Sequence, residues 1–212
     1  MSPDDARSTD RRRFLSQAGA AGALLLASGA AALEAEPPPL GPWDLSWVDK
    51  LAGAKYKVVF DVSPAPSDAY GPDHAGAFLD QFHEVYGTRD DETRAVLVFR
   101  QLGTTLALNN SMWQRYPIDE KRKTNPYLRR SDSTASAGGS DLQSLASRGV
   151  ILLVCNVALG NVVRGLAQAT NRDAADVRAD AEKNLVAGTI IVPSGVFALI
   201  RAQNAGCAYM RQ

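Results

Sequence analysis

The chain has 212 residues, with 23 Lys plus Arg and 23 Asp plus Glu, so its formal net charge at neutral pH is zero. A chain with no excess of positive charge lacks the electrostatic attraction to phosphates that supports nucleic-acid binding, which argues against a nucleic-acid partner. Behind the N-terminal segment, about 180 residues suit one domain, and no second apolar stretch approaches the roughly 20 residues that span a membrane.

The N-terminal segment resembles a bacterial twin-arginine export leader. Arg11-Arg12-Arg13-Phe14-Leu15 precedes a weakly apolar stretch from Ala18 to Leu33, and Ala30-Ala31-Ala32 offers small residues for cleavage. Asp10 and Ser16 stand where the leader pattern has Ser/Thr and Lys. The sequence therefore predicts a signal peptide over 1–32 and a periplasmic protein, with a cytosolic disordered tail or an uncleaved anchor as the alternatives.

A Pro-rich linker is predicted over 33–54, followed by a single domain over 55–212. Val58, Val59 and Phe60 indicate a buried strand, and Phe78 and Phe82 have helical spacing. The first half of the domain is predicted as strand, helix, strand and helix, over Tyr56–Val62, His74–Tyr86, Arg94–Phe99 and Thr104–Tyr116.

A long irregular insertion is predicted over 117–141. It carries the basic residues Lys121–Lys123 and Arg129–Arg130, followed by a Ser/Gly-rich run. A loop of this length in a compact domain is either functional or disordered. Two interpretations stay open, a solvated loop and a lid over an anionic ligand.

The second half of the domain continues the alternation of helices and strands. Ser140 is predicted to cap a short helix that ends at Ser147, and Val150–Val154 is an unbroken apolar run that ends at Cys155. The remaining elements are predicted as helices over 156–169 and 174–185, a strand over 189–192, a helix from Gly195 to Asn204, and a strand over Cys207–Met210.

Alternating strands and helices predict an α/β fold, with a mostly parallel sheet covered by helices on both faces. The carboxyl ends of parallel strands meet at one edge, where open α/β sheets bind their ligands. Asp61 and Cys155 are expected at this edge, and the candidate binding residues there are Ser63, Arg100, Gln101, Asn156 and Ser194. Arg100 is alternatively a solvated side chain, and Ser194 is alternatively a helix cap.

Cys155 is the candidate catalytic residue. It ends a strand and begins a helix, whose N-terminal partial charge favours the reactive thiolate. The alternative is a small hydrophobic residue of the core. Cys207 is predicted at the opposite edge of the sheet, about 17–20 Å away along a strand. Since a disulfide needs Cα atoms within about 7 Å, no Cys155–Cys207 bond is expected.

Several common sites have no support in the sequence. On one helix, His74 and His83 face opposite sides and cannot share a metal ion. Gly160 and Gly165 have the spacing of a phosphate-binding loop, but Leu166 and Ala167 replace its Lys and Ser/Thr. We therefore predict neither a metal nor a cofactor.

The C-terminal block resembles the DsrE/DsrF-like family. The similar segments are Cys155-Asn156, a strand and turn over 187–196, a closing Gln-x-x-Gly-x-x-Tyr over 203–209, and the opening strand over 57–62. The resemblance extends from about Tyr56 to Arg211. It is closest in the last third of the chain.

This resemblance implies a three-layer α/β/α domain with about five parallel strands, assembled as trimers or hexamers. It also implies a persulfide carried on the cysteine that aligns with Cys155, and a sulfur-donor or sulfur-acceptor protein as partner. The sequence thus leaves two hypotheses, an exported persulfide carrier and a non-enzymatic periplasmic module that binds a small ligand or a partner protein.

Overall fold

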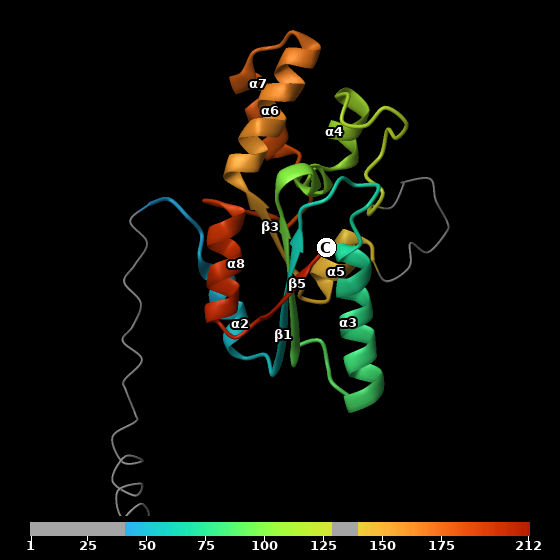
Figure 1. The fold of residues 1–212 in the computed structure, drawn as a ribbon, viewed down its shortest axis with the longest axis vertical. Coiled ribbons are helices and arrows are strands. Elements are labelled where there is room, and N and C mark those ends of the chain that lie inside the picture. Colours follow the sequence, from blue (N-terminus) through green and yellow to red (C-terminus); the bar gives the residue numbers. More distant parts are fainter. Residues whose placement is uncertain (1–40, 129–139) are drawn as a thin grey trace, which may run out of the picture. The chain divides into compact units, whose positions relative to one another are not determined.

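The computed structural model describes residues 41–128 and 140–212, in which helices and strands alternate (Figure 1). The predicted leader over 1–32 lies outside these residues. The strands are β1 (Tyr56–Val62), β2 (Thr93–Phe99), β3 (Ile151–Cys155), β4 (Ile190–Val192) and β5 (Ala208–Arg211). The helices are α2 (Ser46–Ala52), α3 (Gly71–Tyr86), the 3₁₀-helix η1 (Gln101–Ala107), α4 (Asn110–Arg115), α5 (Leu142–Ser147), α6 (Asn156–Thr170), α7 (Ala174–Lys183) and α8 (Gly195–Asn204).

The five strands form one sheet in the order β4-β3-β2-β1-β5. All four pairings are parallel. The register aligns Val62 with Phe99, Phe99 with Val154, and Cys155 with Val192, so the carboxyl ends of β1 to β4 lie at one edge. The predicted α/β/α fold class is confirmed, because helices cover both faces of this parallel sheet (Figure 1).

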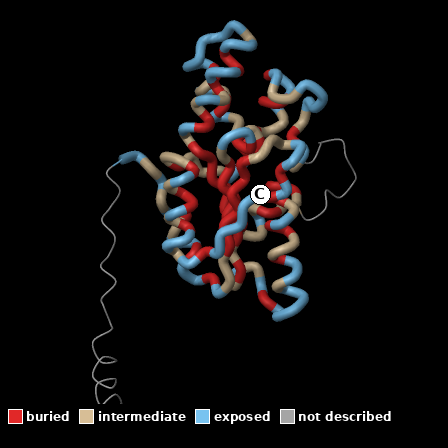
Figure 2. Tube along the Cα trace, in the orientation of Figure 1, coloured by how far each residue is buried: buried red, intermediate tan, exposed pale blue. Residues whose placement is uncertain are grey.

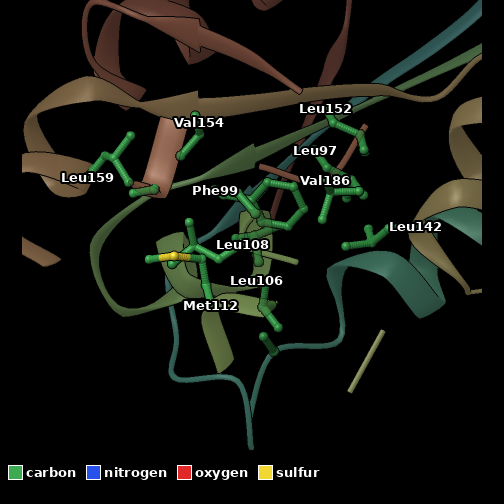
Figure 3. Close-up of a cluster of buried hydrophobic side chains, with 14 of the residues drawn as sticks. Leu97, Phe99, Leu106, Leu108, Met112, Leu142, Leu152, Val154, Leu159 and Val186 are labelled. Atoms are coloured by element: carbon green, nitrogen blue, oxygen red, sulfur yellow. The ribbon is translucent and has the colours of Figure 1, made fainter. Parts of the chain in front are cut away.

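Alternate residues of each strand face the two layers of helices. Phe60 belongs to the larger core, which packs against α3, α5 and α6 and includes the side chains in Figure 3. Val59 belongs to the smaller core on the other face, beneath α2 and α8. Figure 2 shows the strands as a continuous buried centre between the more exposed outer faces of the helices. The central strands are apolar on both sides, as a doubly covered parallel sheet requires.

The prediction of a linker over 33–54 is wrong for residues 46–52. Residues 46–52 form α2, and its residues Trp47 and Leu51 are fully buried in the core beneath α8. The composition misled the prediction, because the Pro-rich segment runs directly into a helix whose apolar side chains are few but large. The compact unit therefore begins at Gly41 rather than at residue 55.

The helix predicted over Thr104–Tyr116 is also wrong. The chain forms η1, leaves the helical conformation at Leu108, and begins α4 after Asn109. The Asn109 side chain accepts hydrogen bonds from the backbone N–H groups of Ser111 and Met112, as a helix cap does. Leu108 and Met112 still reach the same core, which explains why their spacing resembled one helix.

The insertion is irregular over 117–128, as predicted, and residues 129–139 lie outside the described part of the chain. Tyr127 of the insertion contacts the rest of the domain, because its hydroxyl donates a hydrogen bond of 2.6 Å to the carbonyl of Ala69. Asp141, not the predicted Ser140, caps α5 by accepting from the backbone of Ser144. Among the described helices, none is long and apolar enough to cross a membrane.

Candidate functional site

The candidate site lies at the carboxyl edge of the sheet, on the face covered by α8. Asp61 follows Val59 by two positions on β1, and Cys155 follows Leu153 by two on β3, so both share the face of the smaller core. Tyr209 pairs with Val59 across the β1–β5 ladder. Residues from three strands thus meet on one side of one edge.

Asp61 and Arg100 form a two-pronged ion pair in this site. The Nε and Nη2 atoms of Arg100 donate to the two carboxylate oxygens of Asp61, at 2.5 and 2.6 Å. The Asp61 side chain is 1% exposed and the Arg100 side chain 23%. The Tyr209 hydroxyl adds a third hydrogen bond to Asp61, at 2.9 Å. Both oxygens of the buried Asp61 carboxylate therefore accept hydrogen bonds, and the carboxylate holds the Arg100 guanidinium in one orientation.

These contacts also shift pKa values. The hydrogen bond from Arg100 to Asp61 raises the pKa of the guanidinium, against the effect of its partial burial. Burial, followed by the hydrogen bond to Asp61, raises the pKa of the Tyr209 hydroxyl. The positive charge of Arg100 is therefore permanent, and much of it is balanced by Asp61.

The backbone around Arg100 is shaped to hold it. A Cβ atom added at Gly195 would lie 2.7 Å from Cδ and 2.9 Å from Cβ of Arg100, so the arginine stem packs directly on that glycine. Gln101 has φ of 50°, in the left-handed region that residues other than glycine rarely adopt. At Gly103 an added Cβ would lie 2.3 Å from the carbonyl oxygen of Val62. The turn after β2 therefore approaches the end of β1 too closely for a side chain.

Cys155 is the N-cap residue of α6. Its Sγ atom accepts a hydrogen bond from the backbone N–H of Ala158, at 3.3 Å. Arg100 lies near enough that Cys155 makes a minor contribution to the raised pKa of its guanidinium. A helix N-terminus and a nearby arginine are the surroundings in which reactive cysteines are found. Cys155 is nevertheless buried, at 6% exposed, and its sulfur caps the helix that begins beside it.

Cys207 lies at the other edge, immediately before β5. It is equally buried, at 6% exposed. Burial raises the pKa of its thiol to about 11, and Lys57 only partly opposes that shift. Both cysteines are free thiols, in agreement with the strand order predicted to keep them apart.

The remaining predicted residues have local partners. The Asn156 side-chain oxygen accepts from Nη2 of Arg178 on α7, at 2.7 Å. The Ser194 hydroxyl accepts from the backbone N–H of Phe197, at 3.1 Å, and so caps α8. Ser63 is buried, and its carbonyl accepts from the backbone N–H of Gly103. The structure therefore brings Arg100 toward Cys155 and gives Asn156 and Ser194 structural contacts.

Sequence reasoning placed Asp61 at this edge without a role, and it missed two other members of the site. Asp61 is the one charged residue after Lys57 in an otherwise apolar strand. Tyr209 could be assigned only once β5 was known to pair with β1. Gly195 carried no signal, because a glycine after Pro-Ser is equally typical of a turn.

Exposed aliphatic side chains follow three neighbouring strands at the same edge. Leu102 comes after β2, Val157 after β3 and Val196 after β4, and each is about 60% exposed. A separate hollow of about 320 Å³ lies between the end of α6 and the start of α7 and is lined in part by Arg164 and Arg172. It lies at the far end of α6 from Cys155, so it is not part of this site. Among the described residues, no group of His, Cys, Asp and Glu side chains could hold a metal ion.

No protein-family model matches the chain, and no curated protein matches it. Among solved structures, the chain is similar to MTH1491, a protein of unknown function from Methanobacterium thermoautotrophicum. The two share 20% sequence identity with a TM-score of 0.38, over 74% of this chain and 99% of that one. The similarity assigns no activity.

Proposed function

We propose that this protein is an exported, DsrE-like sulfur carrier that holds a sulfur atom as a persulfide on Cys155. The observation that carries the proposal is the setting of the sulfur. Cys155 Sγ lies at the N-terminus of α6 with a backbone N–H directed at it, and Arg100 is nearby. A thiol that must react as a thiolate needs such a positive field.

The sulfur-transfer step needs no oxidant. The Cys155 thiolate attacks the terminal sulfur of a persulfide donor, R–S–SH. A sulfur–sulfur bond forms at Cys155 while the bond within the donor breaks, and the donor leaves as the thiolate R–S⁻. The proton stays on the transferred sulfur, so the protein is left as Cys155–S–SH. The reverse reaction passes the sulfur to an acceptor thiolate.

Asp61 and Tyr209 have a supporting role in this proposal. They hold the Arg100 guanidinium in one orientation, so the charge beside Cys155 does not depend on a flexible side chain. Because Asp61 balances much of that charge, Arg100 stabilises the thiolate or an incoming anionic sulfur without trapping it. The positive field at Cys155 then comes from α6 and Arg100 together.

The burial of Cys155 favours a second candidate function. A cysteine with a purely structural role would have the same features, since Cys155 is 6% exposed and caps a helix. In that case the protein is a non-enzymatic module that binds a small ligand or partner protein at the carboxyl edge. Leu102, Val157 and Val196 then supply its apolar contacts.

Intact mass spectrometry separates the two candidates. Protein recovered from its native compartment is weighed before and after reductant, and then after treatment with inorganic polysulfide. A carrier gains the mass of one sulfur atom, which reductant removes and Cys155→Ser abolishes. Cys207→Ser is the matched control and leaves the gain intact. A protein that never gains sulfur at Cys155 is not a carrier.

Export is tested separately. Replacing the leader pair by Arg11→Lys and Arg12→Lys should leave the precursor in the cytoplasm, because the twin-arginine pathway depends on that pair. Normal accumulation of the double variant in the periplasm would contradict the leader. It would not affect the sulfur-carrier proposal, whose readout is the mass of the purified protein.

A further inference from the structure

The sheet has an open edge at β5. Within residues 41–128 and 140–212, this strand is the last in the strand order and pairs only with β1. All four of its residues are exposed, and Figure 2 shows it as an exposed segment that crosses in front of the buried strands. An uncovered edge strand presents backbone donors and acceptors to any strand that approaches it.

The backbone groups that face outward can be identified from the ladder. The N–H of Gln212 donates to the carbonyl of Asp61 on β1, at 3.1 Å. In a parallel pair, alternate residues bond to the same neighbour, so Met210 also faces β1. Tyr209 and Arg211 therefore direct their N–H and C=O groups away from the sheet.

The side chains at this edge are unusually apolar for an uncovered strand. Tyr209 and Met210 are 46% and 47% exposed, and Tyr70 is 58% exposed. Tyr70 lies beside this edge, because its ring contacts that of His74, which is hydrogen-bonded to Gln212. Edge strands of monomeric proteins are commonly protected by charged side chains, above all Lys, by Pro or by a bulge. The segment Ala208–Arg211 has neither Lys nor Pro, and Arg211 is its one charged residue.

We infer that β5 pairs antiparallel with β5 of a second copy of this chain, which joins two five-stranded sheets into one. The inference does not depend on the sulfur chemistry proposed for Cys155. It assigns a surface and a symmetry to self-association, which the family resemblance left open. A two-fold axis perpendicular to the sheet relates the two copies, so each copy contributes the same edge to the interface.

The sequence of the edge is complementary to itself in this arrangement. With the axis at Met210, each Met210 faces the Met210 of the second copy. Tyr209 then lies opposite Arg211 of the second copy, and both have backbone groups that face outward. Arginine opposite tyrosine is a favourable cross-strand pair, and the two Arg211 side chains stay apart. A strand of four residues makes a small interface, so the dimer should dissociate on dilution.

Residue-resolved amide exchange of the full mature chain, measured with light scattering over a range of concentrations, tests the pairing. The amides of Tyr209 and Arg211 have no acceptor on β1, so they exchange rapidly in a monomer and slowly in the dimer. We expect their protection and the dimer mass to rise together with concentration. A monomer at every concentration overturns the inference. So does protection that is independent of concentration, which would mean that a segment of the same chain covers the edge.

Two variants and a control locate the interface. Arg211→Pro removes an outward N–H and the side chain that faces Tyr209 of the second copy, so it should keep the β1–β5 ladder and abolish the dimer. Met210→Lys places two like charges opposite each other and should also give a monomer. Val85→Lys changes an exposed residue on α3, 68% exposed, and should still dimerise. If Arg211→Pro does not fold, Met210→Lys decides, and a dimer that survives Met210→Lys refutes the pairing.

Discussion

Cys155 and Cys207 are the same residue type, both free and both 6% exposed, yet they lie in different electrostatic settings. Cys155 ends β3 at the carboxyl edge, where the N–H of Ala158 donates to its sulfur and Arg100 lies nearby. Cys207 precedes β5 at the amino edge, where burial raises its pKa to about 11. Equal exposure therefore leaves the two cysteines with different neighbours, a helix N-terminus and an arginine at the carboxyl edge and a lysine at the amino edge.

The same contrast extends to the ion pairs at the two ends of β2. Arg89 and Asp91 precede β2, with side chains 72% and 67% exposed. Arg100 follows β2 and holds Asp61, whose side chain is 1% exposed. An exposed pair contributes little because water competes for both charges, whereas a buried carboxylate depends on its partner. The carboxyl edge is thus the end at which polar contacts are costly to disturb.

The largest expected effect follows from breaking the buried pair. Asp61→Ala should lower the free energy of unfolding by about 3 kcal/mol, because Arg100 and Tyr209 lose their common acceptor in a poorly hydrated site. The matched change at the exposed pair, Asp91→Ala, should leave the free energy of unfolding nearly unchanged, because water screens both charges. Urea unfolding of both variants measures the difference. Equal losses would remove the contrast between the two ends of β2.

The next effect concerns Ser194. Ser194→Ala should cost about 1 kcal/mol, the usual value for a lost helix cap, since the hydroxyl accepts from Phe197. The alkylation rate of Cys155 should not change, because this hydroxyl serves α8. Thermal unfolding and thiol labelling of the same variant give both readouts. If Cys155 labelling slows several-fold at unchanged stability, Ser194 belongs to the site rather than to the cap.

Substitutions at two glycines test whether the position of Arg100 affects Cys155. Gly165→Ala on α6 should stabilise the protein by about 0.5–1 kcal/mol, because nothing lies within 4 Å of the new Cβ. Gly195→Ala should instead displace the Arg100 stem that packs on it. Labelling of Cys155 should then slow, while that of Cys207 stays constant. Unchanged labelling in Gly195→Ala would show that the position of Arg100 does not matter to Cys155.

The effect that is smallest near neutral pH is the pH dependence of stability contributed by Cys207. Its pKa is raised from 9.0 to about 11 in the folded protein, so the unfolded chain releases the proton first. The thiol's contribution to stability is therefore complete below pH 9 and is lost as the pH rises toward 11. In Cys207→Ala, the free energy of unfolding should decrease less as the pH rises through that window. Urea unfolding at several pH values measures it. An identical slope in both proteins would contradict the assigned burial of the thiol.

Much of the fold was predictable because its signals are local. The apolar runs that became β1 and β3 were assigned almost to the residue, and Gly87 ends α3 with φ of 64°, as a glycine cap should. The failures came where tertiary packing overrode local pattern. α2 is held by Trp47 and Leu51 against α8, and the break at Leu108 follows from the competing cap at Asn109.

The site was only partly predictable for a related reason. Arg100 and Cys155 could be assigned to one edge because each follows an obvious strand. The pairing of Asp61 with Arg100 depends on which strands are neighbours, and the contact of Tyr209 depends on β5 lying beside β1. No single segment of the sequence indicates the order of the strands in the sheet. The sequence left the burial of Cys155 open between a reactive thiol and a core residue, because that burial depends on how α6 and α8 pack at this edge.

The most direct test of the account is the competition between the two cysteines for a limiting amount of alkylating agent, near neutral pH, in the folded protein. Peptide mapping then gives the fraction labelled at each site. Because the exposure of the two cysteines is equal and their electrostatic settings differ, the account predicts that Cys155 is labelled well before Cys207 and that Arg100→Ala narrows the gap between the two labelling rates. If neither cysteine reacts until the protein unfolds, Cys155 is a core residue and the proposed sulfur chemistry is wrong.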